Sequence, residues 1–120
     1  MICSGAIFKV CDTSGAKIAK LILLPGAKRF KVRPGSVVRV SIIKADPKSS
    51  IKEGTTHLAI VTSLRSSNSR LNGSVVRFSY NSVNIYDPND KNSKNRPTGM
   101  IDSELKRTHP DIASKSKEVY

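Results

Sequence analysis

Short apolar runs, separated by breaks that contain Gly, Pro or Asn, follow one another along the first 86 residues of the chain. Several runs alternate between apolar and polar positions, which is typical of a β-strand with one buried face. The pattern predicts six strands, over residues 6–11, 18–24, 36–44, 57–64, 75–80 and 83–86. The side chains expected to include the most buried positions are Val38, Val40, Ile42, Leu58, Ile60 and Val76.

Six short strands at near-regular spacing, with no helical crossover between them, favour an all-β fold, a small antiparallel barrel. Asn72-Gly73 is the signal for a two-residue hairpin turn, in which Gly73 takes a positive φ. The chain has 120 residues and a mass of 13.1 kDa, enough for one core of modest size. We therefore expect a single domain over residues 1–120.

The composition changes after the last predicted strand. Residues 87–97 are rich in Asp, Asn, Lys, Ser and Pro, which indicates a loop. Beyond this loop, Asp102 or Ser103 is expected to cap a short helix that ends near residues 109–110. The last ten residues form either another short helix or an extended tail.

The stretch VCDTSGAK, from Val10 to Lys17, resembles the hydrophobic-Asp-Thr-Gly loop of an aspartic protease, with Ser14 inserted before Gly15. Such a protease needs two of these loops, so that two carboxylates share one proton. This chain has one loop, and the protease chemistry needs no large positive charge. The alternative is a hairpin turn in which Asp12 bonds to backbone N–H groups and Gly15 is left-handed. We favour the turn and expect no enzymatic activity.

The sequence contains no pattern typical of a metal site, a cofactor site or a membrane-spanning segment. Cys3 and Cys11, the only cysteines, would lie ~26 Å apart on one extended strand at ~3.3 Å per residue, too far for a disulfide. His57 and His109 are distant in sequence, and no cysteine pair has metal-ligand spacing. No apolar run approaches the ~20 residues that span a bilayer. We expect no metal, no cofactor and no membrane contact, and the N-terminus carries no recognisable targeting segment.

Charge is the strongest functional signal. The chain has 21 Lys and Arg against 9 Asp and Glu, a net charge of +12, which favours a polyanionic partner such as nucleic acid. The charges fall mainly in the predicted connections, so we expect basic loops on a neutral barrel. For Phe30, base stacking and a lid over the barrel end remain equal alternatives. The candidate RNA-binding residues are Lys28, Arg29, Phe30, Lys31, Arg33, Arg65, Arg70, Arg77, Lys94, Arg96, Lys106 and Arg107.

Five segments together resemble the universal large-subunit ribosomal protein family numbered fourteen. They are VCDTSGAK, GAKRFKVRPGS, the following SVVRVSIIKA, NGSVVRF and RPTGMIDSELKR, and the resemblance extends in register over nearly the whole chain. The chain departs from the family pattern at Thr13, Asn72 and Met100. It also carries fewer basic residues in the bend at 66–71, and it has Lys115 and Lys117 where the family is usually apolar or has Pro.

The resemblance implies a five-stranded barrel with a protruding β-ribbon, over residues 1–86, followed by a loop and short C-terminal helices over residues 87–120. It also implies a structural constituent of the large ribosomal subunit that binds large-subunit rRNA, lies at the intersubunit face and contributes bridges to small-subunit rRNA. The implied neighbours are large-subunit proteins three and nineteen, and a ribosome silencing factor. No catalytic role is implied.

From the residues alone, a free single-strand nucleic-acid-binding barrel is the alternative, because small barrels with basic loops also bind flexible strands. Such a protein needs several exposed aromatics on one sheet face, and Phe8 and Phe78 lie in strand patterns that suggest core positions. The sequence has drifted from bacterial and plastid members, and its late loop is rich in Asn, Ser and Lys. These features favour a mitochondrial ribosome, in the matrix, with a divergent bacterial cytoplasm as the alternative.

Overall fold

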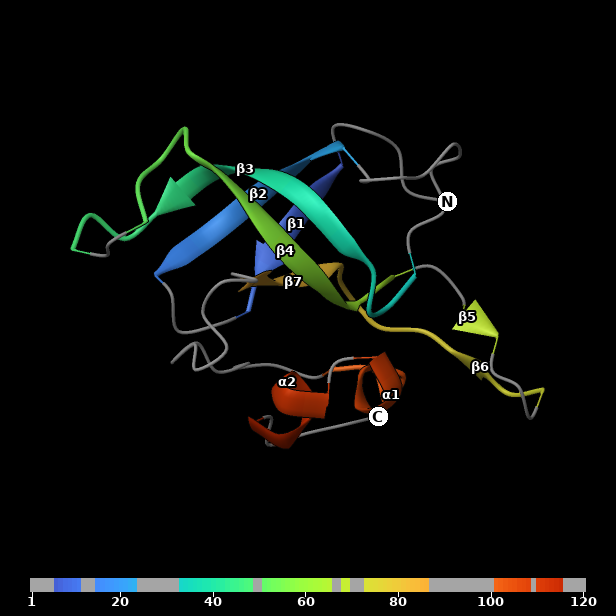
Figure 1. Ribbon diagram of the computed structural model, residues 1–120. Coiled ribbons are helices and arrows are strands. Elements are labelled where there is room, and N and C mark those ends of the chain that lie inside the picture. The colour runs from blue at the N-terminus through green and yellow to red at the C-terminus, as the bar shows by residue number, and fades with distance from the viewer. Residues whose placement is uncertain are drawn as a thin grey trace.

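Five strands close into a barrel in the computed structural model, which describes residues 6–11, 15–23, 33–48, 51–65, 68–69, 73–86, 101–108 and 110–115. Around the barrel the strands follow the order β1-β2-β3-β4-β7 (Figure 1). Their bounds are Ile7–Val10 for β1, Ala16–Leu23 for β2, Val37–Ala45 for β3, Thr56–Ser63 for β4 and Ser82–Tyr86 for β7. The predicted small barrel is therefore confirmed, with most strand ends within two residues of their predicted positions.

The barrel closes with a parallel pair. Four neighbouring pairs are antiparallel, whereas β1 and β7 run parallel and meet at Lys9↔Ser82 and Val10↔Val83. When five strands alternate in direction around a ring, the first and the fifth point the same way. The departure from a wholly antiparallel barrel follows from this odd number of strands.

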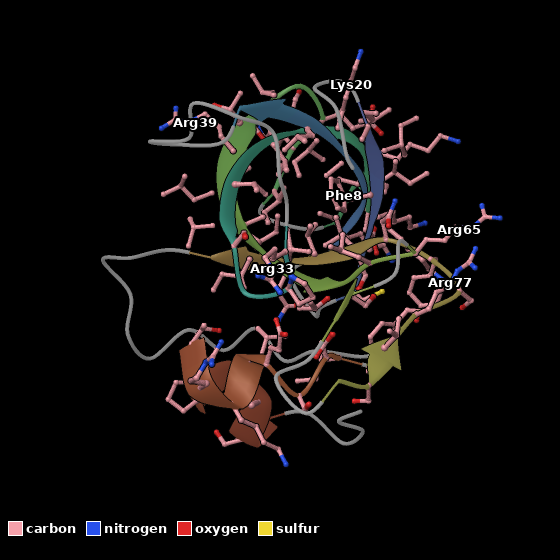
Figure 2. All side chains as sticks on the ribbon, turned by 90° about the vertical axis from the view of Figure 1, so that its right-hand side faces the viewer. Phe8, Lys20, Arg33, Arg39, Arg65 and Arg77 are labelled. Carbon is pink, nitrogen blue, oxygen red and sulfur yellow. The ribbon has the colours of Figure 1, made fainter. Side chains whose placement is uncertain are left out.

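Alternate residues of the strands fill the barrel interior, as a closed sheet requires. Phe8 is fully buried and pairs across the β1–β2 ladder with Ala19, so a large side chain stands beside a small one. Figure 2 shows Phe8 pointing into the ring of strands. The other members of this cluster include Leu21, Val38, Val40, Ile42, Ala59, Val61 and Val83.

Strand β4 is buried on both faces. Ala59 and Val61 face the barrel interior, whereas Ile60 belongs to a second cluster, with Ile101, Leu105 and Ala113. Burial was correctly predicted for Val38, Val40, Ile42 and Ile60, but Leu58 and Val76 are only half-buried. The prediction of Leu58 and Ile60 as core residues of β4 was therefore wrong for Leu58, and the residues that face the barrel interior are Ala59 and Val61. Ile60 is buried by the C-terminal segment on the outside of the barrel.

Two short helices form that C-terminal layer, α1 (Leu105–Thr108) and α2 (Pro110–Lys115), and they lie below the barrel in Figure 1. The predicted cap is confirmed, because Oδ1 of Asp102 accepts a hydrogen bond of 3.0 Å from the N–H of Glu104. The backbone N–H of Asp102 also donates to the carbonyl of Thr62 at 2.8 Å. The cap thus joins α1 to β4. Part of the final segment, left open by the sequence, is helical.

The predicted ribbon is present and projects from the barrel (Figure 1). It consists of β5 (Asn68–Ser69) and β6 (Val75–Val76), which pair antiparallel. The strand predicted over residues 75–80 ends at Val76. Beyond Val76 one backbone hydrogen bond joins the N–H of Phe78 to the carbonyl of Leu64. Side chains supply further bonds, since Ser63 Oγ donates to the carbonyl of Tyr80 and the N–H of Arg65 donates to Asn81 Oδ1.

Gly15 and Gly73 have φ values of 96° and 85°, as predicted for the two turn signals. Residues 12–14 and 70–72 lie outside the described residues, so the turns themselves are not described. Cys11 is buried and is not part of a disulfide, and Cys3 lies outside the described part. Within the ranges given above, no helix is long and apolar enough to cross a membrane, and no three His, Cys, Asp or Glu side chains gather in a way that could hold a metal ion.

We predict that Ile60→Ala lowers the free energy of unfolding by roughly 2 to 5 kcal/mol, because it removes burial and leaves a cavity between β4 and the helices. Urea denaturation followed by circular dichroism measures the change, and we expect one cooperative transition for barrel and helices together. Ile43→Ala is the matched control. Ile43 is 39% exposed on β3, and its truncation should cost less than about 1 kcal/mol. Equal losses for the two variants would contradict the assignment of Ile60 to the second core.

A second prediction concerns the turn before β3. Gly35 has a φ of 89°, and a Cβ at this position would lie 2.5 Å from Thr108 Oγ1 of α1. Gly54 has a φ of 81° and nothing within 4 Å of such a Cβ. Gly54→Ala should therefore cost only the left-handed strain, roughly 1–2 kcal/mol. Gly35→Ala should cost roughly 1–3 kcal/mol more, because of the clash.

Thermal and urea denaturation of Gly35→Ala, Gly54→Ala and the double variant Gly35→Ala/Thr108→Ala test this prediction. In the double variant the hydroxyl that makes the closest contact is gone, and the Cβ of residue 108 remains at 3.3 Å from the added Cβ. The loss should therefore fall most of the way toward that of Gly54→Ala plus the effect of Thr108→Ala alone. Equal stability of the two single glycine variants would show that the turn and α1 do not pack as closely as described.

Candidate nucleic-acid interface

The outer face of β1, β2 and β3 is basic. Because side chains alternate across a strand, the polar positions point away from the buried core. The outward residues Lys9, Lys17, Lys20, Arg39 and Lys44 are all exposed. None of these three strands contains Asp or Glu, and the first 86 residues contain only three acids, Asp12, Asp46 and Glu53. The barrel wall itself therefore carries positive charge.

This basic wall corrects the expectation of basic loops on a neutral barrel. The signal was present in the sequence, because Lys9 stands between Phe8 and Val10, and Lys17 and Lys20 stand between apolar positions of β2. A basic residue at an outward position of an alternating strand remains exposed after folding. The phase of the strands, and not only the composition of the loops, thus predicts where the charge lies.

Arg65 and Arg77 come together at the base of the ribbon. Both are exposed, and Nε of Arg77 donates to the carbonyl oxygen of Arg65 at 3.1 Å. The N–H of Arg65 donates in turn to Asn81 Oδ1 at 2.7 Å. This bond holds the backbone of Arg65 against the residue that precedes β7. Figure 2 shows the two guanidinium groups on the same side of the molecule. Two cations held side by side favour a polyanion over a single neutral partner.

Arg33 lies elsewhere, at the junction between the barrel and the C-terminal helices (Figure 2). Its backbone belongs to the turn at Pro34-Gly35, in which the N–H of Arg33 donates to Ser36 Oγ at 3.2 Å. This turn approaches Thr108 at the end of α1, the helix that carries Lys106 and Arg107. All three cations are exposed. The junction is therefore a second place where predicted contact residues lie near one another in the fold.

The structure thus divides the described candidates into two groups, one at the ribbon base and one beside α1. The remaining candidates lie outside the described residues: Lys28, Arg29, Phe30, Lys31, Arg70, Lys94 and Arg96. Sequence reasoning did not single out Lys9, Lys17, Lys20 or Tyr80. Tyr80 is half-buried and its ring lies 5.0 Å from Nζ of Lys9, so an aromatic ring also borders the basic surface.

A comparison with known protein families gives a match over the entire chain. Residues 1–120 fit the model of the family described as ribosomal protein L14p/L23e. The matched range includes the barrel, the ribbon and the helical layer. The same range carries the five segments on which the resemblance was based.

Proposed function

The chain belongs to the ribosomal protein L14p/L23e family, so it is a structural protein of the large ribosomal subunit, and we propose that its basic surface binds large-subunit rRNA there. The observation that carries this proposal is the acid-free outer wall of β1–β3, which continues the positive charge of the ribbon base. At a net charge of +12 the folded chain repels itself. Phosphates on the wall would offset that repulsion.

The proposed contact residues are the twelve candidates named above. In support, each of the described ones, Arg33, Arg65, Arg77, Lys106 and Arg107, is exposed. Arginine suits such contacts, because its planar fork can bond two phosphate oxygens at once. The wall residues Lys9, Lys17, Lys20 and Lys44 extend the set and would act mainly as point charges that neutralise phosphates.

Within the subunit, we place the protein at the intersubunit face, where it contributes bridges to small-subunit rRNA. Its proposed protein neighbours are large-subunit proteins three and nineteen, together with a ribosome silencing factor. We propose no enzymatic role, since the family is structural. The proposed location is a mitochondrial ribosome, on the ground of sequence drift, with a bacterial ribosome as the alternative.

A free single-strand-binding barrel receives less support from the described residues. Such proteins stack successive bases on several exposed aromatic rings. Phe8 lies inside the barrel and is fully buried, and Phe78 is 8% exposed. Tyr80 is the described aromatic side chain that reaches the surface, and one ring does not make a platform for successive bases.

The sedimentation of the native protein separates these two functions. In a lysate fractionated on a sucrose gradient at millimolar magnesium, an antibody to the chain should detect it with the large subunit and with whole ribosomes. Chelation of magnesium with EDTA separates the subunits, and the chain should then move with the large-subunit fraction. A chain that stays at the top of both gradients would contradict a ribosomal role and favour the free binding protein.

The arginines at the ribbon base should contribute to the salt dependence of RNA binding. Each phosphate contact releases counterions, so losing one should flatten the slope of log K against log salt by about 0.7 to 0.9. We expect this change for Arg65→Ala and for Arg77→Ala, measured by filter binding of large-subunit rRNA. Lys52→Ala removes the same charge from an exposed site in the β3–β4 connection, across the molecule from the ribbon (Figure 1). This control should leave the slope unchanged, and equal slopes for all variants would remove the ribbon base from the interface.

A further inference from the structure

A pocket of about 800 Å³ opens beside the parallel seam where β1 meets β7. Its apolar wall includes Ile7 and Ile18, and the ring of Tyr80 also lines it. Ile7 lies on the outward face of β1 and is 61% exposed, the highest value among the exposed large apolar side chains of the described residues. The pocket therefore presents an accessible apolar and aromatic surface at the edge of the basic wall.

In the described part of the chain, three cations line the same pocket: Lys9, Lys17 and Arg65. Nζ of Lys9 lies 5.0 Å from the centroid of the Tyr80 ring, so one cation and the aromatic ring already lie in contact. A planar aromatic group together with clustered cations matches a ligand that has a flat apolar face and a negative charge. A nucleotide has both, in its base and its phosphate.

Among the described residues that line the pocket, Asp46 is the one acid. It follows β3 and enters from the β2–β3 side, where its N–H donates to the carbonyl of Gly15 at 2.8 Å. Arg65 follows β4 and lines the pocket together with residues 79–81, which come just before β7 on the other side of β1. A carboxylate disfavours a phosphate beside it but accepts hydrogen bonds from the amino and imino groups of bases. The two sides of the pocket thus suit the two parts of a nucleotide.

The wall that carries Tyr80 is held by hydrogen bonds on both flanks. The N–H of Phe78 donates to the carbonyl of Leu64 at 3.1 Å, and Ser63 Oγ donates to the carbonyl of Tyr80 at 3.3 Å. Asn81 accepts from the N–H of Lys9 through its backbone oxygen, at 3.0 Å, and from Arg65 through its side chain. The ring and two of the cations therefore stand on backbone that is fixed before any ligand arrives, which lowers the entropic cost of binding.

We propose that this pocket holds one unpaired nucleotide of the large-subunit rRNA, with its base against Tyr80 and its phosphate between Lys9 and Arg65. The inference rests on the proposed rRNA binding. A free mononucleotide offers the same chemistry, but the rRNA is the favoured source. Its neighbouring phosphates can contact the basic wall at the same time, and linked contacts raise the effective concentration of the base at the pocket.

The test uses an RNA hairpin with a fully paired stem and the same hairpin with one bulged 2-aminopurine, a fluorescent adenine analogue. The wild-type chain should bind the bulged hairpin on the order of tenfold more tightly, as expected for one stacked base. Its binding should also quench the 2-aminopurine emission, because stacking on an aromatic ring quenches this fluorophore. Free 2-aminopurine riboside monophosphate, titrated alone, should bind far more weakly than the bulged hairpin.

Substitutions of Tyr80 separate stacking from charge. Tyr80→Phe keeps a ring and should retain both the preference for the bulge and the quenching. Tyr80→Leu keeps an apolar side chain of intermediate size and should lose both, while binding the paired hairpin within about twofold of wild type. Lys52→Ala, which alters no residue of the pocket, should behave as wild type in its preference and its quenching. Circular dichroism and the thermal midpoint establish that each variant is folded.

Equal wild-type affinity for the two hairpins without quenching, or full quenching retained in folded Tyr80→Leu, would overturn the pocket assignment and leave rRNA binding intact. Free monophosphate binding as tightly as the bulged hairpin would overturn the rRNA as the source. Failure of the wild-type chain to bind any of the RNAs, including large-subunit rRNA at low salt, would contradict the proposed function itself. Different results therefore contradict the nucleotide pocket and the proposed rRNA binding.

Discussion

The closure of five alternating strands into a ring is the constraint on which the rest of the structure depends. It requires one parallel pair, and here that pair is the short seam between β1 and β7, with two register positions. Residues 79–81 come just before β7 and run beside β1, where the N–H of Lys9 donates to the carbonyl of Asn81 at 3.0 Å. Side-chain hydrogen bonds tie the same residues to the end of β4. The pocket, the ring of Tyr80 and the two arginines at the ribbon base are all found next to this seam.

Strand β4 connects the two layers of the protein. Its interior residues Ala59 and Val61 complete the barrel core, while Ile60 and the carbonyl of Thr62 hold the C-terminal segment. Buried hydroxyls also join the end of β4 to β7, because Ser82 Oγ lies 2.6 Å from Thr62 Oγ1 and 2.5 Å from Ser63 Oγ. The helical layer thus depends on the apolar contact of Ile60 and on the hydrogen bond to Thr62, and the positions of Lys106 and Arg107 depend on that layer.

The sequence predicted most strands and the helix cap because these features rest on local patterns of apolar residues and turn signals. It failed where the pattern carries little information or where distant segments decide. Ala59, Ile60 and Val61 are all apolar, so alternation could not assign the inward face of β4. Residues 77–80 alternate like a strand, yet their hydrogen bonds are isolated ones: the N–H of Phe78 donates to the carbonyl of Leu64, and Ser63 Oγ donates to the carbonyl of Tyr80. The parallel seam and the pocket join residues far apart in sequence. No local pattern encodes such pairings.

Because β1 pairs with β7 at Lys9↔Ser82, the second neighbour of β1 is synthesised more than 70 residues after β1 itself. During that interval one edge of β1 has open backbone groups, which are a template for pairing with other chains. Lys9, in the middle of this four-residue edge, places a charge where an intruding strand would have to bury it. The residue that lies over Tyr80 in the finished protein is therefore also a charge of the kind that disfavours pairing at an open strand edge.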